Sequence, residues 1–287
     1  MQSTLSPLRY PGGKTILYED VKNIIMKNGL KGCTYIEPFA GGAGLALKLL
    51  SDKIVDQIII NDFDHAIYCF WYSILNYSEK FCNDIKRTAI NMQEWEKYKN
   101  IYENQDDHSI YEIGFSTFFL NRTNRSGIIK GGPIGGKKQD GEYKLDCRFN
   151  KKVLIEKIYY ISSLKNKIKL FNYDVNDFIK KVVKKQKKNY FIYFDPPYIK
   201  KGPELYQNFF KDEHHKYLSD NIKNNLANTN WIVSYDNHVL VDELYKKFHK
   251  IQFDLNYSAG SNKIGNEVMV FSNTLIKQRK LIINKKR

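Results

Sequence analysis

The sequence predicts an α/β protein, built on a parallel sheet that a mainly helical insertion interrupts. Short apolar strand patterns alternate with helical patterns in the first 62 residues and again from about Lys152 onward, as in sheets whose strands are joined by helices. The stretch from Ala66 to Tyr111 reads instead as aromatic-rich helices whose rings pack in a core. We therefore expect a core of residues 1–64 and 152–287 and an insertion of residues 65–151.

Composition favours a globular protein with a polyanionic partner. The chain has 287 residues, 42% of them hydrophobic, and a formal net charge of +15, which favours association with nucleic acid unless the lysine content only reflects a biased genome. No stretch approaches the ~20 apolar residues of a membrane span, and the N-terminus does not resemble a signal peptide, so we expect a cytoplasmic protein. Four widely spaced cysteines indicate neither a metal site nor a disulfide framework.

The first motif is Gly12-Gly13-Lys14-Thr15, near the N-terminus. It resembles the end of a phosphate loop, but the first glycine of that motif would fall on Leu8, which disfavours a nucleotide triphosphatase. We expect instead that Lys14 lies near a ligand carboxylate and that Tyr10 packs on the flat part of the ligand.

A glycine-rich turn follows the strand pattern that ends at Glu37, in the segment Glu37-Pro38-Phe39-Ala40-Gly41-Gly42-Ala43-Gly44. The third glycine of a dinucleotide fingerprint would fall on Leu47, so a nucleoside ligand without a pyrophosphate fits better. A second strand pattern ends at Asp62, about 20 residues later, where an acid commonly binds ribose hydroxyls. The alternative for Asp62 is a helix N-cap.

A basic, glycine-rich segment runs from Asn121 to Lys152. It holds nine Lys or Arg against three acids, a balance of 9 − 3 = +6, and six glycines. Such a loop can lie along a phosphate backbone while donors reach base edges, so the segment is a candidate nucleic-acid interface, with a disordered surface loop as the alternative. Its candidate contact residues are Asn121, Arg122, Arg125, Lys137 and Arg148.

Asp195-Pro196-Pro197-Tyr198 follows directly on the apolar strand pattern Tyr190–Phe194. The exocyclic amine of a base is a poor nucleophile because its lone pair is delocalised into the ring. The Asp195 carboxylate and the Pro196 carbonyl could accept its two N–H groups, the prolines would fix the direction of that carbonyl, and Tyr198 could stack on the base. The alternative is a plain proline turn at a strand end.

In this order, these motifs resemble the Dam-like, D12 class family of DNA adenine-N6 methyltransferases over nearly the whole chain. The resemblance implies a Rossmann-like class I methyltransferase core that uses S-adenosyl-L-methionine. It implies that the cofactor is contacted by Tyr10, Lys14, Glu37, Phe39, Gly41, Gly42, Gly44, Asp62, Asp174 and Asp195. Asp174 is also explained by a helix cap, and Tyr10 stands where many relatives carry tryptophan.

The implied reaction transfers a methyl group to N6 of a flipped adenine in double-stranded DNA. Asp195, Pro196 and Tyr198 would be the catalytic residues, and no metal is required. Three alternatives stay open: methylation of cytosine N4, methylation of a protein amide, and a catalytically silent DNA-binding relative. The resemblance is also compatible with a companion restriction endonuclease, and it does not carry over a recognition sequence.

Overall fold

The computed structural model describes residues 4–9, 12–187, 189–199, 210–257 and 263–285. In these parts of the chain, seven strands form one sheet in the order β3-β2-β1-β4-β5-β7-β6. The strands are β1 (Thr34–Glu37), β2 (Gln57–Asn61), β3 (Ile168–Phe171), β4 (Tyr190–Phe194), β5 (Asn230–Asp236), β6 (His249–Tyr257) and β7 (Lys263–Phe271). Strands β1 to β5 pair in parallel, and β7 is antiparallel to both β5 and β6. The Rossmann-like α/β core expected from the sequence is confirmed.

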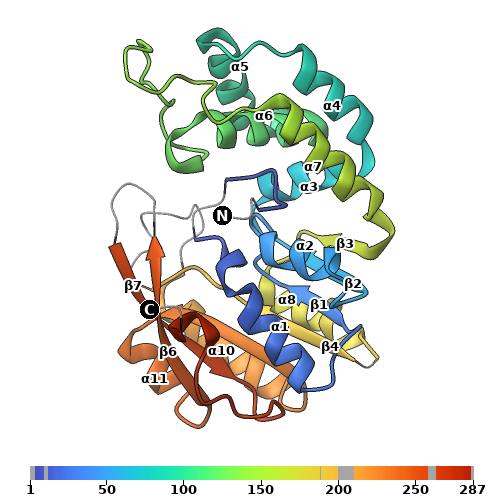
Figure 1. Ribbon diagram of the computed structural model, residues 1–287, viewed down its shortest axis with the longest axis vertical. Coiled ribbons are helices and arrows are strands. Elements are labelled where there is room, and N and C mark those ends of the chain that lie inside the picture. The colour runs from blue at the N-terminus through green and yellow to red at the C-terminus, as the bar shows by residue number, and fades with distance from the viewer. Residues whose placement is uncertain (1–3, 10–11, 188, 200–209, 258–262, 286–287) are drawn as a thin grey trace.

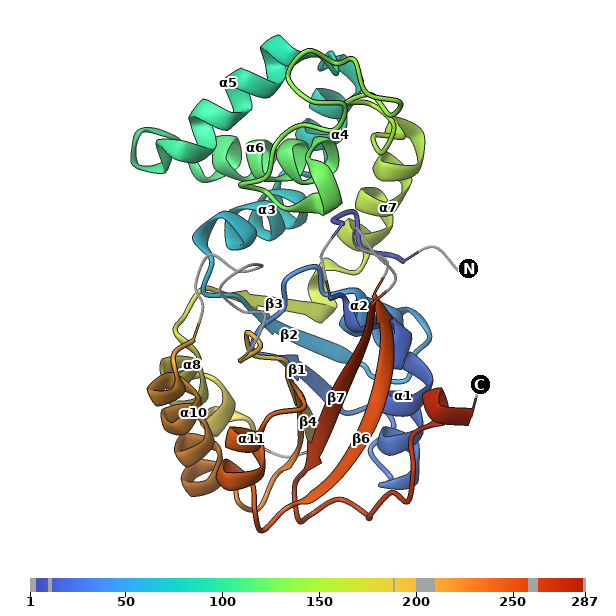
Figure 2. The ribbon, with the colours of Figure 1, turned by 90° about the vertical axis from the view of Figure 1, so that its left-hand side faces the viewer.

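The central strands are short apolar runs because both faces of the sheet are covered. Helices α1 (Tyr18–Lys27) and α2 (Gly44–Ser51) cover one face, while α8 (Val175–Lys181), α10 (Asp212–Asn225) and α11 (Val239–Leu244) cover the other (Figure 2). Along β2, Ile58 and Ile60 join one apolar cluster and Ile59 joins the other. This alternation follows from the two-residue period of a strand.

The helical part is inserted after β2 and lies at one end of the molecule (Figure 1). It comprises α3 (His65–Asn76), α4 (Ser78–Arg87), α5 (Met92–Glu103) and α6 (Ile110–Thr123), and α7 (Lys151–Ser163) leads back to β3. Phe70, Phe81 and Phe118 pack ring against ring in its centre. The apolar cluster of the insertion continues into the α1 and α2 side of the sheet, so the two parts share one core.

Several strands end at the same edge of the sheet, facing the insertion (Figure 2). The chain passes from β1 to β2 on one side, whereas β4 pairs with β1 on the other. The strand order therefore reverses between β1 and β4, and ligands of open α/β sheets bind beyond the carboxyl ends of strands at such a point. Glu37 ends β1 and Asp195 follows β4, so both lie at this position.

None of the helices in the described ranges is long and apolar enough to cross a membrane.

Candidate active site and nucleic-acid interface

Asp195 holds two partners at the end of β4. Its Oδ2 lies 3.1 Å from the ammonium of Lys14, and its Oδ1 accepts a 2.8 Å hydrogen bond from the Ser234 hydroxyl on β5. The Ser234 hydroxyl is in turn 2.8 Å from the Tyr193 hydroxyl. The Lys14 side chain is 5% exposed and that of Asp195 is 21% exposed. These two partners orient the Asp195 carboxylate. Because a carboxylate offers about four acceptor sites, Asp195 can still accept a hydrogen bond from a further donor.

The residues after Asp195 form a tightly held turn. Pro196 is buried, and the N–H of Ile199 donates to the Asp236 carboxylate at the end of β5, over 2.9 Å. Tyr198 is 4% exposed, and the Lys14 ammonium lies 4.7 Å from its ring centroid. A base that stacks on Tyr198 would therefore have to use the rest of the ring surface or displace the Lys14 contact.

Glu37 is a buried carboxyl at the end of β1, 6% exposed. Its Oε1 accepts a 2.9 Å hydrogen bond from the Tyr35 hydroxyl. Burial raises the pKa of Glu37 to about 8, opposed by the Tyr35 hydrogen bond and reinforced by the negative charge of Asp195. A cationic group placed beside Glu37 would stabilise its ionised form and so lower this raised pKa.

The glycine-rich turn is fixed by Asp62 and Trp71. Gly41 has a φ of 46°, and its N–H donates to Asp62 Oδ2 over 2.7 Å while its carbonyl accepts from the Trp71 indole over 2.9 Å. Burial, together with the neighbouring charge of Asp64, raises the pKa of Asp62 to about 7. The alternative that Asp62 caps a helix is not what the structure shows, because Asp64 caps α3 by accepting from the Ala66 N–H over 2.9 Å.

The structure brings most of the other expected cofactor residues to the same region. Gly42 is buried within the turn and Gly44 begins α2, where an added Cβ would meet the Thr15 hydroxyl at 2.5 Å. Phe39 is half-buried and packs edge-on against Phe210, with centroids 5.8 Å apart.

Asp174 lies apart from this region in its role. Asp174 is exposed and caps α8 by accepting from the Asn176 N–H over 2.9 Å, so the structure shows the capping role that the sequence left as an alternative. Tyr10 lies outside the described residues.

Asn121 is placed differently from what the sequence suggested. It is fully buried in α6, where its amide accepts from the Arg9 N–H over 2.7 Å and donates to the carbonyls of Arg9 over 3.0 Å and Gly127 over 2.8 Å. All of these partners are backbone groups, so the expectation that Asn121 reaches a base edge is corrected. It joins the N-terminal segment to the insertion.

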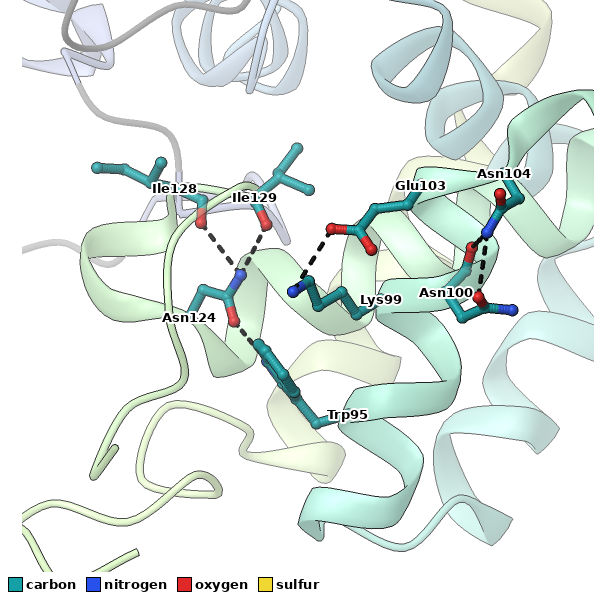
Figure 3. Close-up of polar contacts among 8 residues, drawn as sticks. All are labelled: Trp95, Lys99, Asn100, Glu103, Asn104, Asn124, Ile128 and Ile129. Atoms are coloured by element: carbon teal, nitrogen blue, oxygen red, sulfur yellow. Dashed lines mark hydrogen bonds and ion pairs between the residues drawn. The ribbon is translucent and has the colours of Figure 1, made fainter. Parts of the chain in front are cut away.

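The basic loop after α6 is an ordered structure, contrary to the alternative of a disordered loop. Buried Asn124 accepts from the Trp95 indole on α5 over 2.7 Å and donates to the carbonyls of Ile128 and Ile129 over 3.2 and 2.7 Å (Figure 3). Further along, the Gln139 amide donates to the Ile134 carbonyl over 2.7 Å. The buried amide of Asn124 and the partly buried amide of Gln139 thus satisfy loop carbonyls that regular structure leaves free.

The remaining candidate contacts of the loop differ in exposure. Arg125, Lys137 and Arg148 are exposed. Arg122 is half-buried, and its guanidinium donates to the carbonyl of Arg148, which joins the end of α6 to the end of the loop. Arg122 is therefore held at the base of the loop and partly accessible to solvent, whereas the other three side chains are exposed.

Sequence reasoning missed several residues that shape the site. Ser234 and Asp236 hold the Asp195 turn, and Asn61 donates to the carbonyls of Pro38 and Tyr173, both over 3.0 Å. A usable signal existed for these residues, because each is a polar residue at or near the end of an otherwise apolar strand. No comparable pattern singles out Asn124 or Trp71.

Among the described residues, no group of three His, Cys, Asp or Glu side chains is arranged to hold a metal ion.

The chain matches one family model and is similar to a known methyltransferase. The family model of the D12 class N6 adenine-specific DNA methyltransferases matches residues 10–259. The chain is 25% identical over 205 residues to the Type II methyltransferase M.MjaIII of Methanocaldococcus jannaschii, covering 67% of this chain and 68% of that protein.

Similarity to solved structures is distant. A putative methyltransferase, yhhF, from Escherichia coli has a TM-score of 0.34 at 10% identity, covering 90% of this chain and 86% of that one. The rRNA methyltransferase aviRa from Streptomyces viridochromogenes has a TM-score of 0.39 at 12% identity, covering 92% and 87%.

The assignment rests on the family model, which spans most of the chain and includes the glycine-rich turn, the insertion and the Asp195 turn. This match supports the adenine-specific enzyme over the three alternatives that the sequence left open. The chain belongs to the D12 class N6 adenine-specific DNA methyltransferases, and it is a DNA methyltransferase enzyme.

Proposed function

We propose that this enzyme transfers the sulfonium methyl group of S-adenosyl-L-methionine to N6 of an adenine that is flipped out of double-stranded DNA. The observation that carries the proposal is the oriented Asp195 carboxylate, held by Lys14 and Ser234 at the point where the strand order reverses. Family membership supplies the adenine and the DNA, whereas the donor and the flipping are inferred from the chemistry of the site.

The residues at the ends of β1 and β2 fit such a cofactor. Its methionine part carries an ammonium group, and buried Glu37 lacks an ion pair with any Lys or Arg of the described chain. Asp62 lies beside the glycine-rich turn at the end of the neighbouring strand, where ribose hydroxyls are commonly bound. When bound, the cofactor would supply the electrophilic methyl group.

Asp195 would act on the amine rather than on the cofactor. As the new bond between N6 and the methyl carbon forms and the bond from that carbon to sulfur breaks, positive charge would pass from sulfur to N6, where a fixed carboxylate stabilises it without having to reorient. The methylated nitrogen would then lose one of its N–H protons to solvent. The Lys14 and Ser234 contacts keep the carboxylate in place before the base arrives. Flipping is needed because a stacked adenine cannot bring N6 into line with the methyl group, at a cost of a few kcal/mol.

Radiolabelled S-adenosyl-L-methionine and duplex DNA test the proposal directly. We expect label in the DNA, recovered as 6-methyladenine by mass spectrometry of the digested product. In parallel, 2-aminopurine at the target position should gain fluorescence on binding, because its emission rises when it leaves the stack. Label recovered as 4-methylcytosine, or no transfer to duplexes of diverse sequence, would contradict the proposal.

The pKa of Glu37 predicts a pH dependence for cofactor binding. Because its pKa in the folded protein is about 8, Glu37 is mainly protonated at pH 6.5, and an ammonium group would favour the ionised form. We expect the affinity for S-adenosyl-L-methionine to rise by roughly tenfold between pH 6.5 and pH 8.5, measured by calorimetry.

Glu37→Gln is the matched control for this dependence. It keeps the shape and the Tyr35 hydrogen bond but should bind the cofactor weakly, with the Glu37 contribution to the pH dependence lost. It should also be more stable than the wild type at pH 8, because the native state retains the Glu37 proton above the ordinary glutamate pKa and stability therefore falls as pH rises toward 8. Equal pH profiles for the two proteins would count against Glu37 as the ammonium ligand.

A further inference from the structure

Four basic side chains from separate segments meet where the N-terminal segment touches the insertion. We call Arg9, Arg122 of α6, Arg148 at the end of the loop and Lys157 of α7 the basic cluster. Arg122 donates to the Arg148 carbonyl, and the Arg9 guanidinium donates to the Asn124 carbonyl over 3.1 Å. The Lys157 ammonium donates to the Ser6 carbonyl over 3.3 Å. The basic groups of Arg9, Arg122 and Lys157 are therefore each tied to the backbone of a neighbouring segment, and Arg148 supplies the carbonyl that holds Arg122.

These charges lie close enough to shift one another's pKa. Burial, together with the charges of Arg9 and Arg148, lowers the pKa of Arg122 to about 10. The pKa of Arg9 is lowered by burial and then by Arg148, and that of Lys157 by burial and then by Arg122. Like charges brought together out of water cost free energy unless an anion joins them.

No carboxylate balances this charge within the part of the chain that the structure describes. None of the four side chains makes an ion pair there, although ten other pairs are formed. The Nε of Arg122 is buried and donates to no acceptor. A buried donor without a partner on a charged group costs free energy of folding. If Arg122 only held the Arg148 carbonyl, this cost would have no explanation.

Two contacts hold the backbone of Arg9 against the insertion. Its backbone is held by both polar atoms of the Asn121 amide. The turn at Gly127, with a φ of 76°, approaches so closely that an added Cβ would lie 2.0 Å from the Arg9 carbonyl oxygen. Arg9 precedes Lys14 by five residues, so their Cα atoms are at most about 18 Å apart. The cluster is therefore within a few nucleotides of the Asp195 site.

We propose that the basic cluster binds one phosphodiester group of the DNA backbone beside the nucleotide that is methylated. This inference rests on the proposed function and deepens it by naming what Arg122 and its neighbours contact. A phosphodiester suits the cluster because it offers negative charge and several acceptor oxygens to converging donors. A base edge suits it poorly, because Arg122 is half-buried and tied to the Arg148 backbone.

Salt-dependent DNA binding tests this proposal. Duplexes of different sequence are mixed with the full chain in the absence of cofactor. Fluorescence anisotropy then gives the Kd at a series of NaCl concentrations from roughly 50 to 300 mM, over which counterion release makes binding strongly salt-dependent. For Arg122→Gln we expect about tenfold weaker binding to every duplex and a salt slope smaller in magnitude by roughly 1. Arg279→Gln, which removes an exposed arginine of the C-terminal segment, is the matched control and should change the slope little.

A second variant and a second probe separate the outcomes. Lys157→Gln removes the charge that α7 contributes to the cluster, so a folding defect confined to Arg122→Gln would not prevent the test. A methylphosphonate placed at the contacted phosphate should weaken wild-type binding but not binding by Arg122→Gln. An unchanged salt slope in both variants, or a loss restricted to one DNA sequence, would overturn the proposal. Because no cofactor is present, these results do not depend on whether methyl transfer occurs.

Discussion

Asp195→Ala is expected to lower the rate of methyl transfer by at least about 10³-fold, since it removes the group that stabilises positive charge on N6. The same change deprives Lys14 and Ser234 of their shared partner. The sheet should survive, because Asp195 follows β4 and makes no strand pairing. Single-turnover transfer of radiolabel into DNA is the measurement, with circular dichroism to verify the fold.

Asp195→Asn refines this prediction. The amide can still accept from Ser234 but no longer offers a negative charge to Lys14 or to the amine, so we expect a loss close to that of the alanine variant. Cofactor affinity, measured by calorimetry, should change far less than the rate in both variants. Wild-type turnover by either variant would remove Asp195 from the mechanism.

Asn121→Ala is expected to have the largest effect on stability among the residues of the basic segment. It leaves the Arg9 N–H and the carbonyls of Arg9 and Gly127 without their side-chain partner in a buried place. Each buried group left unpaired costs about 1–3 kcal/mol, so the free energy of unfolding should fall by about 3 kcal/mol or more. Urea unfolding followed by fluorescence gives this difference.

An exposed asparagine provides the control for that change. Asn104→Ala at the end of α5 removes an exposed side chain whose hydrogen bonds, among the described residues, go to Asn100 one turn earlier, and it should cost well under half as much. Gly127→Ala should disturb the same contact without changing Asn121, because the added Cβ would overlap the Arg9 carbonyl that Asn121 binds. If Asn121→Ala were as stable as Asn104→Ala and still failed to bind DNA, a direct role in base recognition would be restored.

The fold was accessible from the sequence because its signals are local. Ile58 to Ile60 and Phe191 to Phe194 are apolar without interruption, which indicates strands buried on both faces. The glycine-rich turn and the Asp195 turn were recognisable because each follows directly on such a strand. Parallel strands place their carboxyl ends at one edge, so sequence order alone was enough to bring Glu37, Asp62 and Asp195 into one region.

The basic segment was harder to interpret, because charge and glycine content do not specify contacts. The amide of Asn121 has the donor and acceptor that a base-reading residue needs. Its partners are nevertheless the backbone groups of Arg9 and Gly127, and Arg9 lies 112 positions away in the sequence. Asn124 is similar, since its indole partner Trp95 is on another helix. An amide can pair equally well with a base edge or with a backbone, and only burial distinguishes the two.

The sequence by itself determined the parallel sheet, the two turns that carry the candidate catalytic and cofactor residues, and the family, because each depends on patterns of a few adjacent residues. Only the tertiary structure decided that Ser234 and Lys14 orient Asp195, that Asn121 is a structural link, and that Arg9 and Lys157 join Arg122. These contacts join segments distant along the chain, and their geometry depends on how helices and strands pack together.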